Sequence, residues 1–156
     1  MPKTALDRKV PDFTLPATGT EKRWSLKQAA GRKLVIFFYP KDMTSGCTLE
    51  AQGFRDHVGA FRKAGTTIVG ISRDSLASHE KFCAKEKLPY VLLSDEDEKV
   101  CRLFDVIQEK SLYGRKYMGI ERSTFLIDAE GILRREWRKV KVNGHVEEVL
   151  EAAQSL

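Results

Sequence analysis

Residues 34–50 read LVIFFYPKDMTSGCTLE, a stretch that predicts a strand, a loop and the start of a helix. The apolar run ends at Pro40, because proline cannot donate to a sheet ladder. Thr44 and Gly46 are residue types that cap or open helices, so a helix is expected to begin beside them. Apolar residues then recur at alternating steps of four and three, namely Cys47, Ala51, Phe54, Val58 and Phe61. Cys47 is therefore expected in the first turn of a helix, on its inward face.

The position of Cys47 favours a reactive thiol. At the start of a helix the sulfur faces unpaired backbone N–H groups and the positive end of the helix dipole, and both favour the thiolate over the thiol. A free cysteine is also among the most buried residue types, so the position alone leaves a small apolar core residue as an equal alternative. The neighbouring Pro40, Thr44 and Gly46 favour the nucleophile.

The length and hydropathy of the chain limit its class. With 156 residues it is the size of one domain and can bury a substantial core without disulfides, so a single domain spanning residues 1–156 is expected. Residues 1–9 include no apolar signal-peptide region, and no later apolar run approaches the roughly 18 residues that cross a bilayer. The chain is therefore expected neither to be exported through a cleaved signal nor to span a membrane.

The cysteine content indicates a reducing compartment. Cys47, Cys83 and Cys101 are widely spaced and odd in number, which does not suit the disulfide framework of a secreted domain. The expected location is the cytoplasm, where thiols serve as chemical tools.

The net charge of +5 raises the question of an anionic partner such as nucleic acid or a membrane surface. The 27 basic residues are interspersed with 22 acidic ones, which is the pattern of a solvated surface of mixed charge. The sequence therefore predicts no nucleic-acid partner and no membrane partner.

The stretch around Cys47 resembles a known family. The spacing of Pro40, Thr44 and Cys47, P-x-x-x-T-x-x-C, resembles the peroxidatic signature of the peroxiredoxins. The longer string FYPKD at residues 38–42, followed by GCTxE at residues 46–50, is similar to the Q subfamily, also called bacterioferritin comigratory proteins. Further matches lie downstream: GISxDS at 70–75, LLSD at 92–95, YG at 113–114 and GIxRSTFLID at 119–128. The likeness spans nearly the whole chain.

The remaining pattern predicts alternating strands and helices. Strands are expected at residues 10–16, 22–26, 34–39, 67–71, 90–93, 124–127 and 132–137. Helical segments are expected at 25–30, from Cys47 to Gly65, from Asp74 or Ser75 to Pro89, from Asp95 to Phe104, and after Gly144. The first two strands form an N-terminal β-hairpin and the last two a second hairpin. This order indicates an α/β domain of thioredoxin-like fold, with a mixed central sheet flanked by helices.

The resemblance implies a thiol peroxidase in which Cys47 attacks the O–O bond of a peroxide and becomes a sulfenic acid. It assigns Thr44 to orienting the peroxide and Arg122 to stabilising both the thiolate and the transition state. Backbone N–H groups of Gly46 and Cys47 add donors, and Pro40 shapes the pocket and shields the sulfur. A lower thiol pKa alone gains only about ten- to thirty-fold in thiolate, so most of the acceleration is expected from these donors.

The sequence leaves alternatives open for three of these residues. Arg122 precedes a predicted strand and, without the resemblance, is a surface arginine. Thr44 also suits an N-cap, a role that is compatible with binding peroxide. Glu50 suits either a bidentate pair with an arginine or a favourable place at a helix N-terminus.

A sulfenic acid needs a second thiol to be recycled before it is oxidised further. Many members of the Q subfamily carry this resolving cysteine five positions after the first, where this chain has Gln52. A second variant places it in the following helix, and Cys83 matches that position. The resemblance thus implies an intramolecular disulfide between Cys47 and Cys83. Bridged α-carbons lie within about 7 Å and two cysteines held in helices rarely start that close, so local unwinding around both is expected on oxidation. Cys101, on an apolar stripe, is expected to pack in the core.

The implied function is reduction of hydrogen peroxide and organic hydroperoxides, with a role in antioxidant defence. The implied electron donor is thioredoxin or another dithiol, and nothing in the residues distinguishes thioredoxin from glutaredoxin or a small thiol. No metal, haem or flavin cofactor is required. Resolution within one chain requires no dimer, so a monomer is expected.

Three other functions have weaker support. A disulfide oxidoreductase of the thioredoxin kind needs Cys-x-x-Cys, but Cys47 is followed by TLE. His79 and Cys83 share a helical face and are residue types that bind zinc, but no second ligand pair is evident. A nucleic-acid-binding or holdase role would rest on basic residues that alternate over both faces of a strand without an aromatic platform. These residues are Arg134, Arg135, Arg138, Lys139 and Lys141.

Overall fold

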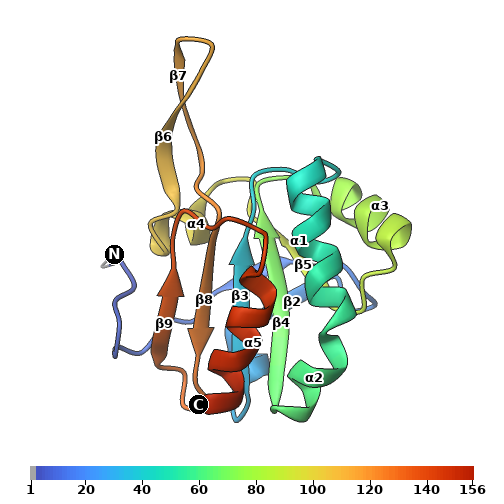
Figure 1. Cartoon of the computed structure of the whole chain (residues 1–156), viewed down its shortest axis with the longest axis vertical. Helices are drawn as coiled ribbons and strands as arrows, with labels where there is room; N and C mark the ends of the chain where they lie inside the picture. Colours follow the sequence, from blue (N-terminus) through green and yellow to red (C-terminus); the bar gives the residue numbers. More distant parts are fainter. Residues whose placement is uncertain (1–2) are drawn as a thin grey trace.

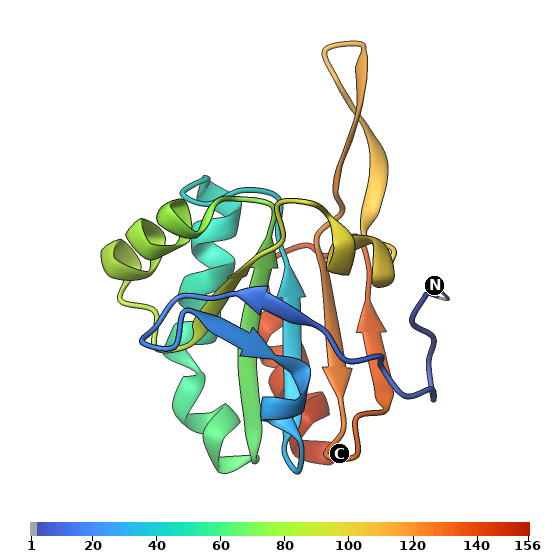
Figure 2. The ribbon, with the colours of Figure 1, turned by 180° about the vertical axis from the view of Figure 1, so that it is seen from behind.

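The computed structural model describes residues 3–156, which build a mixed sheet covered on both faces (Figure 1; Figure 2). Its five strands lie in the order β5 (Val91–Ser94), β4 (Thr66–Ser72), β3 (Lys33–Phe38), β8 (Ser123–Ile127) and β9 (Leu133–Trp137). β3, β4 and β5 are parallel, whereas β8 pairs antiparallel with both β3 and β9. The mixed central sheet expected from the sequence is confirmed.

The central strand β3 divides the core, because its side chains alternate between the two faces. Val35 and Phe37 belong to the apolar cluster on one face, and Leu34 and Ile36 to the cluster on the other. One face carries the helices α1 (Ser45–Asp56), α2 (Val58–Lys63), α3 (Leu76–Glu86) and α5 (His145–Ser155). The other carries the hairpin of β1 (Thr14–Pro16) and β2 (Arg23–Ser25), the 3-10 helix η1 (Leu26–Ala29) and α4 (Lys99–Leu103). Burial on both sides explains the unbroken apolar run of β3.

The helix expected from Cys47 to Gly65 is interrupted at His57, which separates α1 from α2. His57 has φ −104° and ψ 6°, outside the usual helical values. Its backbone N–H and its ring Nδ1 both bond to the carbonyl oxygen of Gly53, at 3.2 and 2.8 Å. The expectation of one continuous helix was wrong at this residue, where the Gly53 carbonyl oxygen accepts the His57 ring N–H in addition to the regular backbone bond.

The helix expected to open at Asp95 begins later, at Lys99. The carboxylate of Asp95 accepts hydrogen bonds from the backbone N–H groups of Val100, at 3.2 Å, and Cys101, at 2.6 Å. Asp95 therefore binds the first turn of α4 from outside the helix, and the acidic segment forms the turn that precedes it.

The hairpin of β6 (Ile107–Leu112) and β7 (Arg115–Ile120) was not predicted from the sequence. It projects well beyond the sheet (Figure 1). Its two-residue turn has positive φ at both Tyr113 (51°) and Gly114 (76°), the geometry of the turns that suit hairpins. Tyrosine is an unusual residue for the first of these positions, so the usual asparagine or aspartate signal was missing.

Several of the basic residues considered for nucleic acid are engaged within the molecule. Arg134 binds the carboxylates of Asp7 and Asp128, at 3.0 and 2.8 Å. Arg138 donates to the carbonyl oxygens of Phe104 and Asp105, at 3.0 and 2.9 Å. Among residues 3–156, no helix is long and apolar enough to cross a membrane.

Gly70, in the middle of β4, is a position at which a mutation can test the packing of the sheet against α1. A Cβ at this position would lie 2.7 Å from Cζ of Phe37 and 2.8 Å from Cδ2 of Leu92. The Phe37 ring cannot move aside, because it stacks on Phe54 of α1 at a centroid distance of 4.6 Å. We expect Gly70→Ala to lower the free energy of unfolding by about 1–3 kcal/mol, measured by urea denaturation.

The matched control is Gly59→Ala in α2, where an added Cβ meets nothing within 4 Å. Alanine is the better helix former, so stability should stay equal or rise. Equal effects of the two substitutions would show that the contact at Gly70 does not limit the packing.

Candidate active site

Cys47 occupies the first turn of α1, as predicted, and is only 2% exposed. The end of β3 leads to it through a loop in which Pro40 is half-buried. The sulfur thus lies at the helix end where backbone N–H groups have no helical partners and where the dipole favours negative charge.

Arg122 lies within hydrogen-bond distance of the Cys47 sulfur. Its Nη2 is 3.3 Å from Sγ of Cys47, and its Nη1 donates to Oε1 of Glu50 at 2.7 Å. The antiparallel pairing of β8 with β3 explains the contact, because Ser123 pairs with Phe38 just before the Cys47 loop. The side chain of Arg122 is 16% exposed, so it is not the surface arginine of the alternative interpretation.

Glu50 is fully buried beside this arginine. The pair uses one carboxylate oxygen and is not bidentate, since the second guanidinium nitrogen faces the sulfur. Oε2 of Glu50 has no hydrogen-bond partner within residues 3–156. Burial raises the pKa of Glu50 to about 7, although the charge of Arg122 opposes the rise. Burial would lower the pKa of Arg122, but Glu50 and Cys47 together raise it, so the guanidinium stays charged.

Gly46 and Thr44 lie at the N-terminal end of α1, close to Cys47 in the chain. A Cβ on Gly46 would lie 3.3 Å from Nη2 of Arg122, so the missing side chain leaves room for the guanidinium. Thr44 is the N-cap residue of α1, but its side chain makes no capping hydrogen bond. Its hydroxyl instead donates to the carbonyl oxygen of Lys41 at 2.9 Å, which leaves the lone pairs of an exposed oxygen available. A capping role for this hydroxyl is therefore wrong.

Lys110 of β6 is a neighbour of the site that sequence reasoning missed. Burial and the charge of Arg122 lower its pKa, while Cys47 opposes the shift. The signal was missing because the hairpin that carries this lysine was itself not predicted. Arg122 and Lys110 thus add positive charge to the site from two elements, which suits negative charge developing on a departing oxygen.

Cys83 lies on α3, half-buried, with its thiol 3.7 Å from Oγ1 of Thr18. Burial raises the pKa of this thiol. Thr18 is tied to β5, because its Oγ1 also accepts from the N–H of Leu92 at 3.0 Å. Arg122, the partner of Cys47, lies just before β8. In the sheet, β8 is three strand spacings from β5, or about 14 Å at the usual spacing. The cysteines within residues 3–156 are all free, so the structure describes the reduced protein.

Cys101 is fully buried in the core cluster on the other face of the sheet, as expected. Burial and the neighbouring Asp95 carboxylate raise the pKa of its thiol far above the usual range. This thiol is therefore unreactive in the folded protein.

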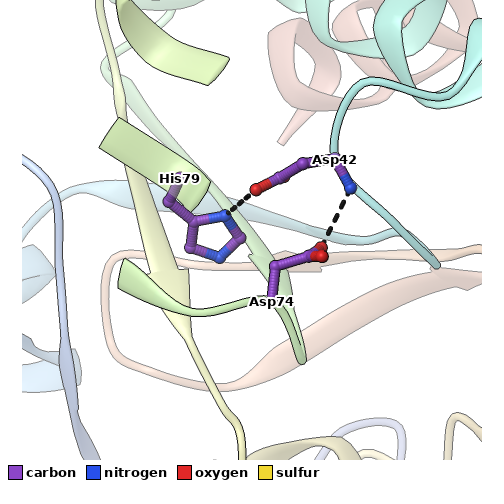
Figure 3. Close-up of side chains that lie close together, drawn as sticks. All are labelled: Asp42, Asp74 and His79. Atoms are coloured by element: carbon purple, nitrogen blue, oxygen red, sulfur yellow. Dashed lines mark hydrogen bonds and ion pairs between the residues drawn. The ribbon is translucent and has the colours of Figure 1, made fainter. Parts of the chain in front are cut away.

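His79 forms a buried network that the sequence did not reveal (Figure 3). Its Nδ1 lies 2.7 Å from Oδ2 of Asp42, and its Nε2 lies 2.9 Å from the carbonyl oxygen of Leu93. Ligand atoms of Asp42, Asp74 and His79 lie within 4.8 Å of one another, but hydrogen bonds already join them. Both ring nitrogens are engaged, so His79 has no nitrogen left for the zinc site considered with Cys83.

Comparisons with known proteins find relatives that match almost the whole chain. Residues 6–136 match the AhpC/TSA family. The chain is 50% identical over 143 residues to a putative peroxiredoxin Bcp of Coxiella burnetii, covering 92% of this chain and 94% of that protein. It is 49% identical over 155 residues to the peroxiredoxin Bcp of Xanthomonas campestris, covering 97% of this chain and 96% of that protein.

Solved structures give the same result. Peroxiredoxin Q of Xanthomonas campestris superposes with a TM-score of 0.87 at 50% identity, over 92% of this chain and 90% of that one. That protein has also been solved as a trapped intermediate/ligand complex bearing on its alkyl peroxide reduction activity, and with either of two cysteines replaced by serine. A mutant PrxQ of Xylella fastidiosa superposes with a TM-score of 0.91 at 38% identity, over 97% of this chain and 96% of that one.

These neighbours confirm the thioredoxin-like fold expected from the sequence. Identity near one half over almost the full length of both chains is far above what a shared fold alone requires. The chain belongs to the AhpC/TSA family, among its peroxiredoxin Q or Bcp members, and is a thiol-dependent peroxidase.

Proposed function

We propose that Cys47 is the peroxidatic cysteine of this thiol peroxidase. Its thiolate forms a bond to one oxygen of a hydroperoxide while the O–O bond breaks. The sulfur is oxidised to a sulfenic acid, and the other oxygen leaves with the bonding pair and takes up a proton to give water or an alcohol. The observation that carries the proposal is the 3.3 Å contact between Nη2 of Arg122 and Sγ of Cys47 at a helix N-terminus.

The surrounding residues have separate roles in this step. Arg122 stabilises the thiolate and then the negative charge that grows on the peroxide oxygens, and Glu50 holds the guanidinium in place. The exposed oxygen of Thr44 accepts the O–H of the peroxide and orients it in line with the sulfur. Gly46 leaves space for the arginine and contributes its N–H, while Pro40 shields the sulfur from water.

The substrates that this site suits are hydrogen peroxide and organic hydroperoxides, since the chemistry involves only the two oxygens. The alkyl peroxide reduction activity named for the Xanthomonas protein supports the second class. No metal, haem or flavin enters the reaction, because the sulfur itself accepts the oxygen.

Cys83 then attacks the sulfur of the Cys47 sulfenic acid. A disulfide forms, the S–O bond breaks, and the oxygen leaves as water. The two cysteines that were replaced by serine in the Xanthomonas structures are as far apart in that chain as Cys47 and Cys83 are here, which supports the pair. Bringing the sulfurs together requires both to leave their present partners, Arg122 and Thr18.

A dithiol donor, with thioredoxin as the proposed one, reduces this disulfide and returns the enzyme to the thiol form. Resolution within one chain requires no second copy, so we propose a monomer built as one domain. The free, odd-numbered cysteines suit a reducing compartment, for which the cytoplasm is the proposed location.

Rapid mixing with hydrogen peroxide tests the assignment of the two cysteines. Cys47→Ser should abolish peroxide consumption, because within residues 3–156 no other thiol contacts the arginine. Cys83→Ser should consume one equivalent at the wild-type rate and then fail to turn over with a dithiol donor. Cys101→Ala is the control and should turn over normally. Consumption that survives Cys47→Ser would refute the peroxidatic assignment.

Glu50→Gln tests the buried carboxyl through the pH dependence of stability. Because burial raises the pKa of Glu50 from 4.5 to about 7, the folded state holds more protons than the unfolded state between these pH values. Its contribution to the free energy of unfolding therefore falls as pH rises through this window, by up to about 3 kcal/mol. Relative to Glu50→Gln, the wild type should lose stability between pH 4.5 and 7 in urea denaturation.

The exposed Glu147→Gln substitution on α5 serves as the control, and its stability difference from wild type should not follow this course. A wild type that gains stability relative to Glu50→Gln over the same interval would contradict the raised pKa.

A further inference from the structure

A buried ion pair joins the two segments that carry the reactive thiols. Asp42 lies in the loop five residues before Cys47, and His79 lies on α3 four residues, about one turn, before Cys83. The side chains of Asp42 and His79 are 2% and 0% exposed. Figure 3 shows the His79 ring pointing at the Asp42 carboxylate across the gap between loop and helix.

Several hydrogen bonds converge on this pair. The carbonyl oxygen of Leu93 can only accept, so Nε2 of His79 carries a proton. The Asp42 carboxylate also receives the hydroxyl protons of Tyr39, at 2.6 Å, and Ser78, at 2.8 Å. Nδ1 of His79, 2.7 Å from Oδ2, adds a third hydrogen bond to this carboxyl group. Burial alone would raise the pKa of Asp42, but the bonds from His79, Tyr39 and Ser78 lower it.

The pair matters for the second step of the cycle. The Cys47 thiol is held toward β8 and the Cys83 thiol toward β5, so disulfide formation requires the Cys47 loop and α3 to shift relative to each other. Such a shift separates Asp42 from His79. Separation inside the folded core leaves two buried charges unpaired, which is strongly unfavourable unless α3 unwinds far enough to expose them to water.

We propose that the Asp42–His79 ion pair holds α3 against the Cys47 loop and sets the rate at which Cys83 reaches the oxidised Cys47. His79 and Asp42 are positioning residues in this proposal, which rests on the proposed resolving function of Cys83. The pair keeps the site assembled for reaction with peroxide and delays its opening. Breaking it therefore speeds resolution and shortens the time in which the sulfenic acid is open to further oxidation.

The test separates the two steps in His79→Asn, Asp42→Asn and the double variant. Rapid mixing with hydrogen peroxide gives the rate of the first oxidation, and acid quenching with peptide mapping gives the rate of the Cys47–Cys83 linkage. Hydrogen exchange of residues 76–86, compared with residues 66–72 of β4, reports the opening of α3 in the reduced protein. His57→Asn is the control, because it removes a hydrogen-bonded histidine at the α1–α2 break, away from Asp42.

Both single variants should leave the first oxidation within about twofold of wild type and raise disulfide formation and α3 exchange by about tenfold or more, the scale of one lost charged hydrogen bond. The double variant should exceed neither single variant, since one interaction is lost in all three. His57→Asn should match wild type in both steps.

Two results would overturn the proposal: linkage rates that stay at or below the wild-type value in both single variants, or effects that multiply in the double variant. Absence of any Cys47–Cys83 linkage in the wild type is a different failure. It would refute the resolving role of Cys83, and the proposal would fall with it.

Discussion

The contact between the Arg122 guanidinium and the Cys47 sulfur is the constraint on which the rest of the site depends. A buried guanidinium is tolerated only where its charge is matched, and here the Glu50 carboxylate and the sulfur share it. α1 supplies both partners from one helical face, three residues apart, while the pairing of β8 with β3 supplies the arginine. Gly46 leaves the necessary room. Because the sheet fixes all these elements, the donors are in place before a peroxide arrives, which is the condition for electrostatic stabilisation of a transition state.

The same packing that shields the sulfur opposes the second half of the cycle. The first step needs an assembled pocket, whereas the disulfide that we propose would need Cys47 to leave Arg122 and Cys83 to leave Thr18. α3 is suited to local opening, because it buries only His79 and Phe82 fully. It therefore depends less on apolar packing than β3 does. In a segment of this kind, a few buried polar contacts decide the free energy of local opening.

The sequence predicted the features that local signals determine. The strand, loop and helix around Cys47 follow from the apolar run, the proline and the capping residues, and the structure reproduces them. Arg122 was identified only through the family resemblance, since its contact joins residues distant in the chain and depends on strand register. The β6–β7 hairpin was missed because Tyr113 occupies a turn position that asparagine or glycine usually marks. The Asp42–His79 pair was missed because, like Arg122 and Cys47, its two residues are distant in the chain. Nothing in the local sequence around either residue specifies the other.

The most direct test of the account is the rate of the first oxidation of Arg122→Lys by hydrogen peroxide, measured by rapid mixing before any recycling. Lysine keeps the charge but cannot bind Glu50 and the sulfur through two fixed N–H groups at once. Loss of one donor aimed at developing negative charge lowers such rates by about a hundredfold or more, so a fall of this size is predicted. A rate equal to that of the wild type, in a variant that folds normally, would contradict the central role of the arginine contact.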